Sequence, residues 1–113
     1  MTDCIFCKIS RGEIPANLLY QDSELFAFED ISPQAPSHIL ICPRKHLVSL
    51  SDTAEGDAAW LGRALLVAAR LAADRGLGGG YRVVVNNGSR VGQTVLHLHF
   101  HLLGGRDFHW PPG

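Results

Sequence analysis

The chain has 113 residues, of which 10 are Lys or Arg and 11 are Asp or Glu, and its formal net charge is −1. This length predicts one domain with a modest core that a second subunit would help to complete, and the charge argues against nucleic-acid polymers and anionic membranes as partners of the whole domain. No stretch approaches the roughly 18 continuous apolar residues of a membrane span, and the N-terminus lacks a signal-peptide pattern, so we expect a cytoplasmic protein.

The first half of the chain predicts one helical turn and three strands. The turn covers residues 4–10, and the strands cover 18–21, 25–30 and 38–42. Asp22 and Ser23 form the turn between the first two strands, which form a hairpin of alternating residues. Pro33 and Pro36 predict a loop before the third strand because proline lacks the backbone donor that helices and sheets use. Pro43 ends that strand.

A single long helix is predicted over residues 52–75, where apolar residues recur at steps of one, three and four. Asp52 and Glu55, three residues apart, resemble a capping box at its start, and Arg75 before Gly76 is typical of a helix end. The glycine-rich segment that follows, GLGGGYR, is a helix stop and not a phosphate loop, because its glycines end a helix and precede a strand.

Two further strands are predicted over 81–87 and 94–103. Strands joined by short turns, with one long helix to cover a face, predict an α+β domain with an antiparallel sheet. We expect five strands, the long helix and a short N-terminal helix, in one domain that spans 1–113.

Three histidines alternate with apolar residues in the last of these strands. In a strand His97, His99 and His101 point to one face, while Leu98 and Phe100 point to the other. Neighbouring histidines lie about 6.7 Å apart and the first and third about 13 Å, which makes three ligands to one ion awkward without a bend. A single histidine would be read as a core residue; three in strict alternation favour a chemical role for that face.

The histidine segment does not stand alone. It occurs with IPA, FEDISPQAPSHIL, PRKH, GYRVVVNNG, GQTVLHLHFHLLGGR and a terminal HWPPG, in that order. Together these motifs resemble the histidine triad (HIT) superfamily, and within it the Hint branch, over nearly the whole chain. The resemblance implies a purine nucleoside 5′-phosphoramidase that cleaves the P–N bond of AMP or GMP linked to an amine, through a covalent nucleotidyl-histidine.

The resemblance also assigns catalytic roles. His99 would be the nucleophile, and His101 would donate hydrogen bonds to the phosphoryl oxygens, as in an oxyanion hole. His38 matches the histidine that contacts and orients the nucleophile. Thr94 stands where relatives commonly have Ser, and its hydroxyl would donate to the leaving amine.

The nucleotide-binding positions follow from the same resemblance. Asp30 matches the carboxylate that accepts hydrogen bonds from the two ribose hydroxyls. The apolar positions around the base are Phe6, Ile9, Phe28 and Ile31, and the positions near the phosphate are Asn86 and Gln93. Taken without the resemblance, the apolar four would be read as core residues.

Cys4 and Cys7 are three residues apart on one side of the predicted turn, a spacing that suits two ligands of a tetrahedral metal. The remaining candidate ligands are His46 and His97, and several bacterial relatives carry zinc on such a set. We expect structural zinc, with no cofactor needed for catalysis, because four protein ligands close the coordination shell. A free thiol pair or a redox motif is the alternative. Cys42 is a core residue.

The resemblance implies a homodimer in which the tail, residues 108–113, reaches the interface and the partner's site. Two other functions remain open. The alternatives are a nucleotide-binding adaptor with incidental hydrolysis and a dinucleoside polyphosphate hydrolase of the same superfamily. Turnover of phosphoramidate and dinucleotide substrates separates the three functions.

Overall fold

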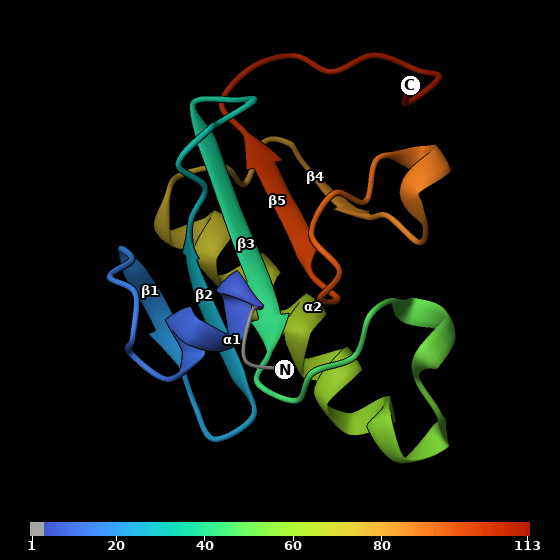
Figure 1. Cartoon of the computed structure of the whole chain (residues 1–113). Coiled ribbons are helices and arrows are strands. Elements are labelled where there is room, and N and C mark those ends of the chain that lie inside the picture. The colour runs from blue at the N-terminus through green and yellow to red at the C-terminus, as the bar shows by residue number, and fades with distance from the viewer. Residues whose placement is uncertain (1–3) are drawn as a thin grey trace.

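The computed structural model describes residues 4–113 and contains one five-stranded antiparallel sheet in the order β1-β2-β3-β5-β4 (Figure 1). The strands are β1 Leu18–Gln21, β2 Leu25–Glu29, β3 Ser37–Pro43, β4 Tyr81–Val85 and β5 Phe100–Gly104. The helices are α1 Ile5–Ser10 and α2 Ala58–Asp74. The predicted fold class is therefore confirmed, and β1 and β4 are the sheet edges.

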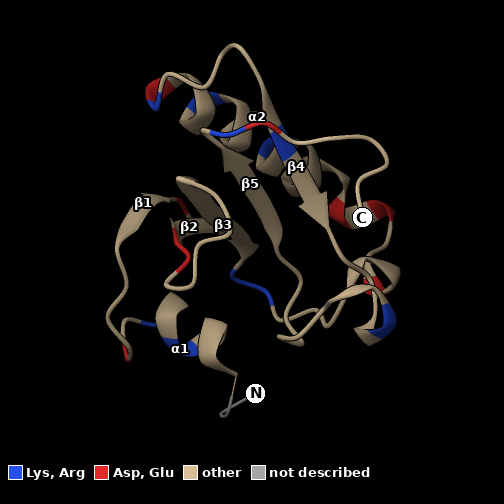
Figure 2. Ribbon diagram, turned by 90° about the horizontal axis from the view of Figure 1, so that it is seen from above, with Lys and Arg blue, Asp and Glu red and all other residues tan. Residues whose placement is uncertain are grey.

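The two helices cover opposite faces of the sheet, as the view in Figure 2 shows. Packed on one face, α2 forms the main core with the odd-numbered residues of β3, Ile39 and Ile41. On the other face α1 covers part of the sheet and packs with the even-numbered residues Leu40 and Cys42. This alternation follows from the period of two in a strand, so β3 contributes to both layers. Cys42 is fully buried, as predicted.

The long helix begins six residues later than predicted, at Ala58. Two 3-10 turns, Leu50–Asp52 and Glu55–Asp57, precede it, with the chain extended at Thr53 between them. The predicted pairing of Asp52 with Glu55 is wrong, because each of the two acidic caps bonds three residues back. Asp52 accepts from the backbone N–H of Ser49 at 3.1 Å, and Asp57 accepts from that of Ala54 at 2.9 Å.

The helix end agrees with the prediction. Arg75 is the C-cap, Gly76 has a φ of 73°, and the N–H of Leu77 bonds the carbonyl of Ala72 at 2.8 Å. A positive φ strains residues with a Cβ and suits glycine. The following glycines lead into β4 and hold no helix N-terminus, so a helix stop is the correct interpretation. Among residues 4–113, no helix is both long and apolar enough to cross a membrane.

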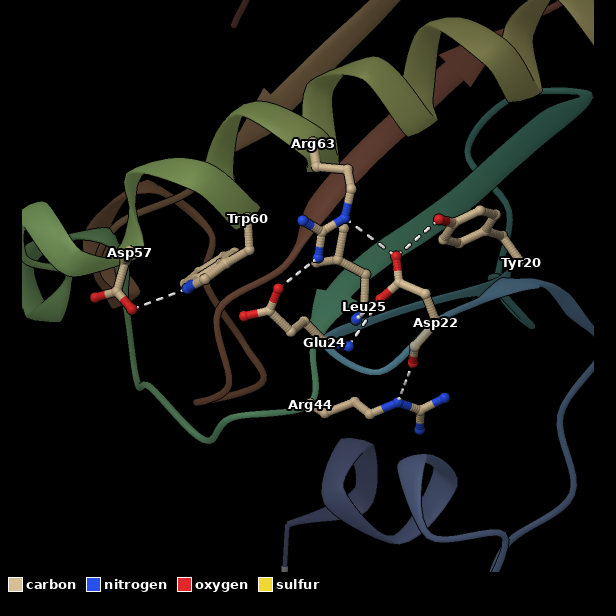
Figure 3. Close-up of polar contacts among 8 residues, drawn as sticks. All are labelled: Tyr20, Asp22, Glu24, Leu25, Arg44, Asp57, Trp60 and Arg63. Atoms are coloured by element: carbon tan, nitrogen blue, oxygen red, sulfur yellow. Dashed lines mark hydrogen bonds and ion pairs between the residues drawn. The ribbon is translucent and has the colours of Figure 1, made fainter.

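The β1–β2 turn is tied to α2 by a polar network centred on Asp22 (Figure 3). Its carboxylate accepts hydrogen bonds from Tyr20 Oη at 2.7 Å, from the backbone N–H of Glu24 and Leu25 at 2.7 Å, and from Arg63 Nε at 3.2 Å. The turn predicted at this position is thus stabilised both locally and through a side chain of α2.

The strand that carries the histidines is shorter than predicted. It starts at Phe100, and residues 95–97 form a bend that continues as irregular chain through His99. The apolar partners in this segment, Leu98, Phe100 and Leu102, are buried in the main core as the alternation predicts. This bend separates the side chain of His97 from those of His99 and His101.

Candidate active site

A cavity of about 780 Å³ lies between α1 and the sheet face that α1 covers. It is lined by all four predicted catalytic residues, His38, Thr94, His99 and His101. It is also lined by five of the seven predicted nucleotide-binding residues, Phe6, Ile9, Phe28, Asp30 and Ile31. Residues from the N-terminal helix, from β2 and β3, and from the last strand therefore meet at one site.

The imidazole of His99 is held in one orientation by the backbone of His97. Its Nδ1 lies 2.7 Å from the His97 carbonyl oxygen, and its ring is 5.1 Å from that of Phe6, edge to face. A carbonyl oxygen only accepts, so Nδ1 carries the proton and Nε2 of the neutral ring keeps a free lone pair. His99 is thus a buried imidazole prepared to act as a nucleophile or base.

The tautomers of His38 and His101 are set by a backbone donor. The N–H of Gln34 donates to His38 Nδ1 at 3.0 Å, and His38 Nε2 lies 2.8 Å from His101 Nδ1. With Nδ1 accepting, the proton of His38 is on Nε2 and is donated to His101. His101 must then carry its own proton on Nε2. The neutral His101 ring therefore has an N–H donor available beyond the pair.

The cavity histidines are neutral at pH 7 because burial disfavours their charged forms. Burial, followed by the rings of His99 and His38, lowers the pKa of His101 to about 4. Burial also lowers the pKa of His99, against the effect of its bond to the His97 carbonyl. The pKa of His38 is lowered by burial and raised less by Asp30. The lone pair on His99 is thus available without prior loss of a proton.

Asp30 lies beside this pair. Its Oδ1 accepts from the N–H of Ser32 at 2.8 Å, and its Oδ2 lies 3.5 Å from His38 Nε2. Both contacts leave carboxylate lone pairs free toward the cavity. A carboxylate in this position can accept two hydrogen bonds from a bound polyol.

The apolar wall of the cavity is built mainly by aromatic residues. Phe6 of α1 packs edge to face on Phe28 of β2, with ring centroids 5.4 Å apart, and Ile9 is buried in the same cluster. Ile31, by contrast, is 96% exposed, so it lies at the rim. These apolar side chains have no polar groups that would distinguish one planar ring from another.

Asn86 and Gln93 are the predicted binding residues that the structure does not bring to the cavity wall. The side chain of Gln93 is buried and connects three segments: it donates to the carbonyls of Val48 and Val95 and accepts from the N–H of Gly88. With its amide occupied in this way, Gln93 supports the loop before Thr94.

Several lining residues were missed from the sequence. They are Ile5, Ile14, Pro15, Ala16, Asn17, Glu29, Ser32, Gln34, Leu40 and Val95. Leu40 was detectable, since it is two residues from His38 on the same strand face. Gln34 contributes through its backbone N–H, for which a residue type gives no signal.

A second cluster, here called the tetrad, consists of Cys4, Cys7, His46 and His97. Its ligand atoms lie within 4.8 Å of one another. The Nδ1 atoms of His46 and His97 are 3.2 Å apart, Cys4 Sγ is 3.3 Å from His97 Nδ1, and Cys7 Sγ is 3.3 Å from His46 Nδ1. Ligands of a tetrahedral zinc lie about 3.3 to 3.8 Å apart, given the usual Zn–N and Zn–S bond lengths. The predicted metal ligands thus form a cluster of suitable size.

The protonation pattern of the tetrad also suits a metal. His97 Nε2 donates to the carbonyl of Pro43 at 2.7 Å, which leaves Nδ1 unprotonated and directed at Cys4 and Cys7. Burial lowers the pKa of His97 to about 4, and burial raises the pKa of Cys7. A bound cation would reverse the second effect because a coordinated thiol loses its proton. The donor set fits zinc.

Comparisons with known proteins agree with these features. Residues 11–108 match the model of the HIT domain family. An uncharacterized HIT-like protein of Synechocystis sp. is 55% identical over 111 residues, which cover 98% of this chain and 97% of that protein. The crystal structure of a HIT family hydrolase from Legionella pneumophila is similar with a TM-score of 0.95 at 49% identity, covering 98% of this chain and 100% of that one. A histidine triad nucleotide-binding protein from Candida albicans has a TM-score of 0.83 at 35% identity, covering 98% and 85%.

Proposed function

This chain belongs to the HIT domain family, and from that premise we propose that it is a hydrolase of the Hint branch that cleaves purine nucleoside 5′-phosphoramidates. The observation that carries the proposal is the state of His99. Its Nδ1–H is bound to the His97 carbonyl, and its Nε2 lone pair is free in a cavity that also contains His101, Thr94 and Asp30. The names of the Legionella and Candida proteins, a hydrolase and a nucleotide-binding protein, support the same class.

The reaction proceeds in two displacements at phosphorus. The His99 Nε2 lone pair forms a bond to phosphorus as the P–N bond breaks, and the amine leaves with a proton donated by the Thr94 hydroxyl. Water then attacks the phosphorus of the nucleotidyl-histidine, returns a proton to Thr94, and releases the nucleoside monophosphate and His99. Dividing one difficult displacement into two easier ones is the benefit of the covalent route.

The other residues bind and orient. His101 donates its Nε2–H to a phosphoryl oxygen, where negative charge builds up in both transition states. His38 acts as a positioning residue because its N–H determines which nitrogen of His101 is the donor. Asp30 accepts the ribose hydroxyls, and the base lies against Phe6, Ile9 and Phe28. Since this wall is apolar, either purine fits it.

We also propose that the tetrad holds a structural zinc ion. Two thiols and two imidazoles are the ligands that zinc prefers, and four of them leave no position for water or substrate. The ion would therefore stabilise the fold and take no part in the displacements.

A second copy of this chain is the proposed partner. The edge strand β4 and helix α2 border a groove of about 440 Å³ lined by Leu50, Leu61, Gly62, Leu65, Val83, Val85 and Phe100. Leu65 is 52% exposed, and Trp110 in the tail is 84% exposed. An exposed edge strand beside apolar side chains is stabilised by pairing with another copy. On the basis of the Hint resemblance we propose that the tail of each subunit lies near the site of the other.

Steady-state turnover of a fluorogenic adenosine 5′-phosphoramidate tests the function. We expect His99→Ala to lower kcat/KM by about 10⁴-fold or more, as for other catalytic nucleophiles, with an unchanged fold and metal content. A protein that binds AMP but hydrolyses no phosphoramidate would instead be a nucleotide-binding adaptor. Faster turnover of a dinucleoside polyphosphate than of the phosphoramidate would assign it to the other hydrolase branch.

A further inference from the structure

His97 belongs to both functional clusters of the molecule. Its side chain is fully buried, with Nδ1 in the tetrad and Nε2 bonded to the Pro43 carbonyl. Its backbone carbonyl accepts the Nδ1–H of His99. One residue therefore connects the candidate metal ligands directly to the orientation of the proposed nucleophile.

The backbone around His97 is held by few hydrogen bonds besides those of His97 itself, one of which runs from Gln93 Nε2 to the carbonyl of Val95 at 3.2 Å. Residues 95–99 lie outside β5, and the main-chain bond that ties them to a neighbouring segment runs from the N–H of Leu98 to the carbonyl of Leu47 at 2.7 Å. Leu47 follows His46, a member of the tetrad. The tetrad and this bond thus join segments 43–47 and 95–99 at adjacent points.

The third segment joined at the tetrad is α1, which contributes Cys4 at its N-cap and Cys7. A helix of six residues is unstable by itself, so its position depends on tertiary contacts. Arg44 holds its C-terminal end through bonds to the carbonyl and hydroxyl of Ser10 at 2.9 and 3.0 Å. The tetrad holds the N-terminal end.

Phe6 carries this dependence into the cavity. Its ring lies 5.8 Å from the ring of His97 and 5.1 Å from that of His99, and it forms part of the apolar wall. Displacement of the N-terminal end of α1 would therefore alter the wall and the packing on His99 together.

From this geometry we infer that metal occupancy of the tetrad and nucleotide binding in the cavity are thermodynamically coupled, through His97 and Phe6, so that each strengthens the other. The inference rests on the proposed function for the nucleotide and on the proposed zinc for the metal. Coupling between binding sites is reciprocal, and about a tenfold effect is typical. The tetrad is then more than a brace for the fold: it determines how well the cavity is formed.

The test uses the full chain, loaded with Zn²⁺ or treated with a chelator, and AMP as the nucleotide. We expect the Kd for AMP, measured by calorimetry, to be about tenfold higher in the chelated protein, and saturating AMP to lower the Kd for zinc, measured by equilibrium competition with a chelator, by about the same factor. Equal zinc Kd values with and without AMP would overturn the coupling. If the chelated protein unfolds, AMP binding by the His46→Ala variant decides the question.

Two variants separate the tetrad from the surrounding core. His46→Ala removes a ligand that does not line the cavity, and we expect it to weaken AMP binding about tenfold without recovery on addition of zinc. Cys42→Ala is the matched control, since it removes a buried thiol behind the same wall, outside the tetrad, and should leave AMP binding and zinc content unchanged. AMP binding by His46→Ala equal to that of the wild type would contradict the inference.

A readout without nucleotide distinguishes failure of the coupling from failure of the proposed function. Zinc removal should increase hydrogen exchange in residues 5–9 by about tenfold and shift the ¹⁵N signal of His99 Nδ1. If AMP binds neither form, the nucleotide function fails, and these signals alone decide whether the tetrad orders the cavity. Exchange and signals that zinc leaves unchanged, or a protein that binds no zinc, would overturn the inference.

Discussion

His38 and His101 form one hydrogen-bonded pair across neighbouring strands, with His38 Nε2 donating to His101 Nδ1 over 2.8 Å. His101 is directly opposite Leu40 in the pairing of β3 with β5, so His38 is its diagonal neighbour on the same sheet face. His38 Nε2 is the donor of this bond and His101 Nδ1 is the acceptor. The proton of the neutral His101 ring is therefore on Nε2, where it can be donated to another group. Removal of His38 should therefore alter what His101 does more than what the cavity binds.

We predict that His38→Phe lowers kcat for a fluorogenic phosphoramidate by about 10- to 100-fold, with a smaller change in KM. Phenylalanine fills the space but gives His101 Nδ1 no donor, so His101 can move its proton to that nitrogen and lose the donor for the phosphoryl oxygens. His38→Gln, which can donate through its amide, should recover part of the loss. Equal kcat values for the Phe variant and the wild type would refute the role given to His38.

The acid limb of the activity profile should reflect the lowered pKa of His99. Burial favours the neutral ring, so the Nε2 lone pair persists to a lower pH than in an ordinary histidine, whose pKa is about 6.5. We expect kcat/KM to be flat from about pH 6.5 to 8 and to decline below that range. Measured rates that show an acid midpoint at or above the ordinary histidine value would argue against a buried, neutral nucleophile.

Asp22 should stabilise the fold only above acidic pH. Burial alone would raise its pKa, but hydrogen bonds from Tyr20, from the N–H groups of Glu24 and Leu25 and from Arg63 outweigh this and lower the pKa to about 2. The unfolded value is about 3.9, so the stabilisation is present above that pH and is lost as the pH falls toward about 2. We expect Asp22→Asn to cost about 1 to 2 kcal/mol at pH 7, after allowance for partial exposure, and almost nothing at pH 2.

Denaturant unfolding at several pH values measures this difference between Asp22→Asn and the wild type. Glu55→Gln, at an exposed carboxylate that precedes the long helix, is the control and should change the free energy of unfolding by no more than about 0.5 kcal/mol. A destabilisation by Asp22→Asn that is the same at pH 7 and pH 2 would show that the ion and its hydrogen bonds are not its source.

Deletion of residues 108–113 should alter the choice of leaving group more than it alters folding. Within its own chain the tail is held chiefly by Phe108, whose ring lies under the guanidinium groups of Arg82 and Arg106 at 5.0 and 4.1 Å, and by the His109 carbonyl, which accepts from Arg82. Trp110 extends into solvent. We expect the melting temperature to fall by less than about 5 °C.

The ratio of turnover with an aromatic amine to turnover with a small alkyl amine as leaving group should change by about threefold or more on this deletion, a difference worth about 0.7 kcal/mol. Trp110→Ala should reproduce most of that change. Parallel losses of melting temperature and of activity with both amines would mean that the tail serves folding alone.

The alternation of histidine with apolar residues predicted the two faces of the last strand but not where the strand begins. Leu98, Phe100 and Leu102 enter the core as expected, whereas pairing with β3 and β4 starts only at Phe100. The bend at 95–97 depends on tertiary contacts of His97 with residues from the other end of the chain, which a local pattern does not contain. The difficulty that a straight strand posed for three histidine ligands does not arise, because His97 alone of the three belongs to the tetrad.

The start of the long helix was misplaced for a related reason. Within residues 49–57 an aspartate carboxylate twice accepts a hydrogen bond from the backbone N–H three residues before it, at Asp52 and again at Asp57. Spacing alone does not choose between successive caps. The cavity histidines, Thr94 and Asp30 were predicted because their side chains carry the chemistry, whereas Gln34, which acts through its backbone N–H, was missed.

Three main-chain groups decide which nitrogens of the histidines hold protons: the N–H of Gln34, and the carbonyls of His97 and Pro43. At position 34 only proline would delete the donor. The carbonyls of Pro43 and His97 remain in any variant, although the position of the His97 carbonyl also depends on the tetrad. The proton pattern is therefore insensitive to most side-chain replacements outside His38 and the tetrad, and is vulnerable to insertions or deletions that shift these three segments. Drift in the loop sequences of this domain can therefore be extensive while the acid–base state of its histidines stays the same.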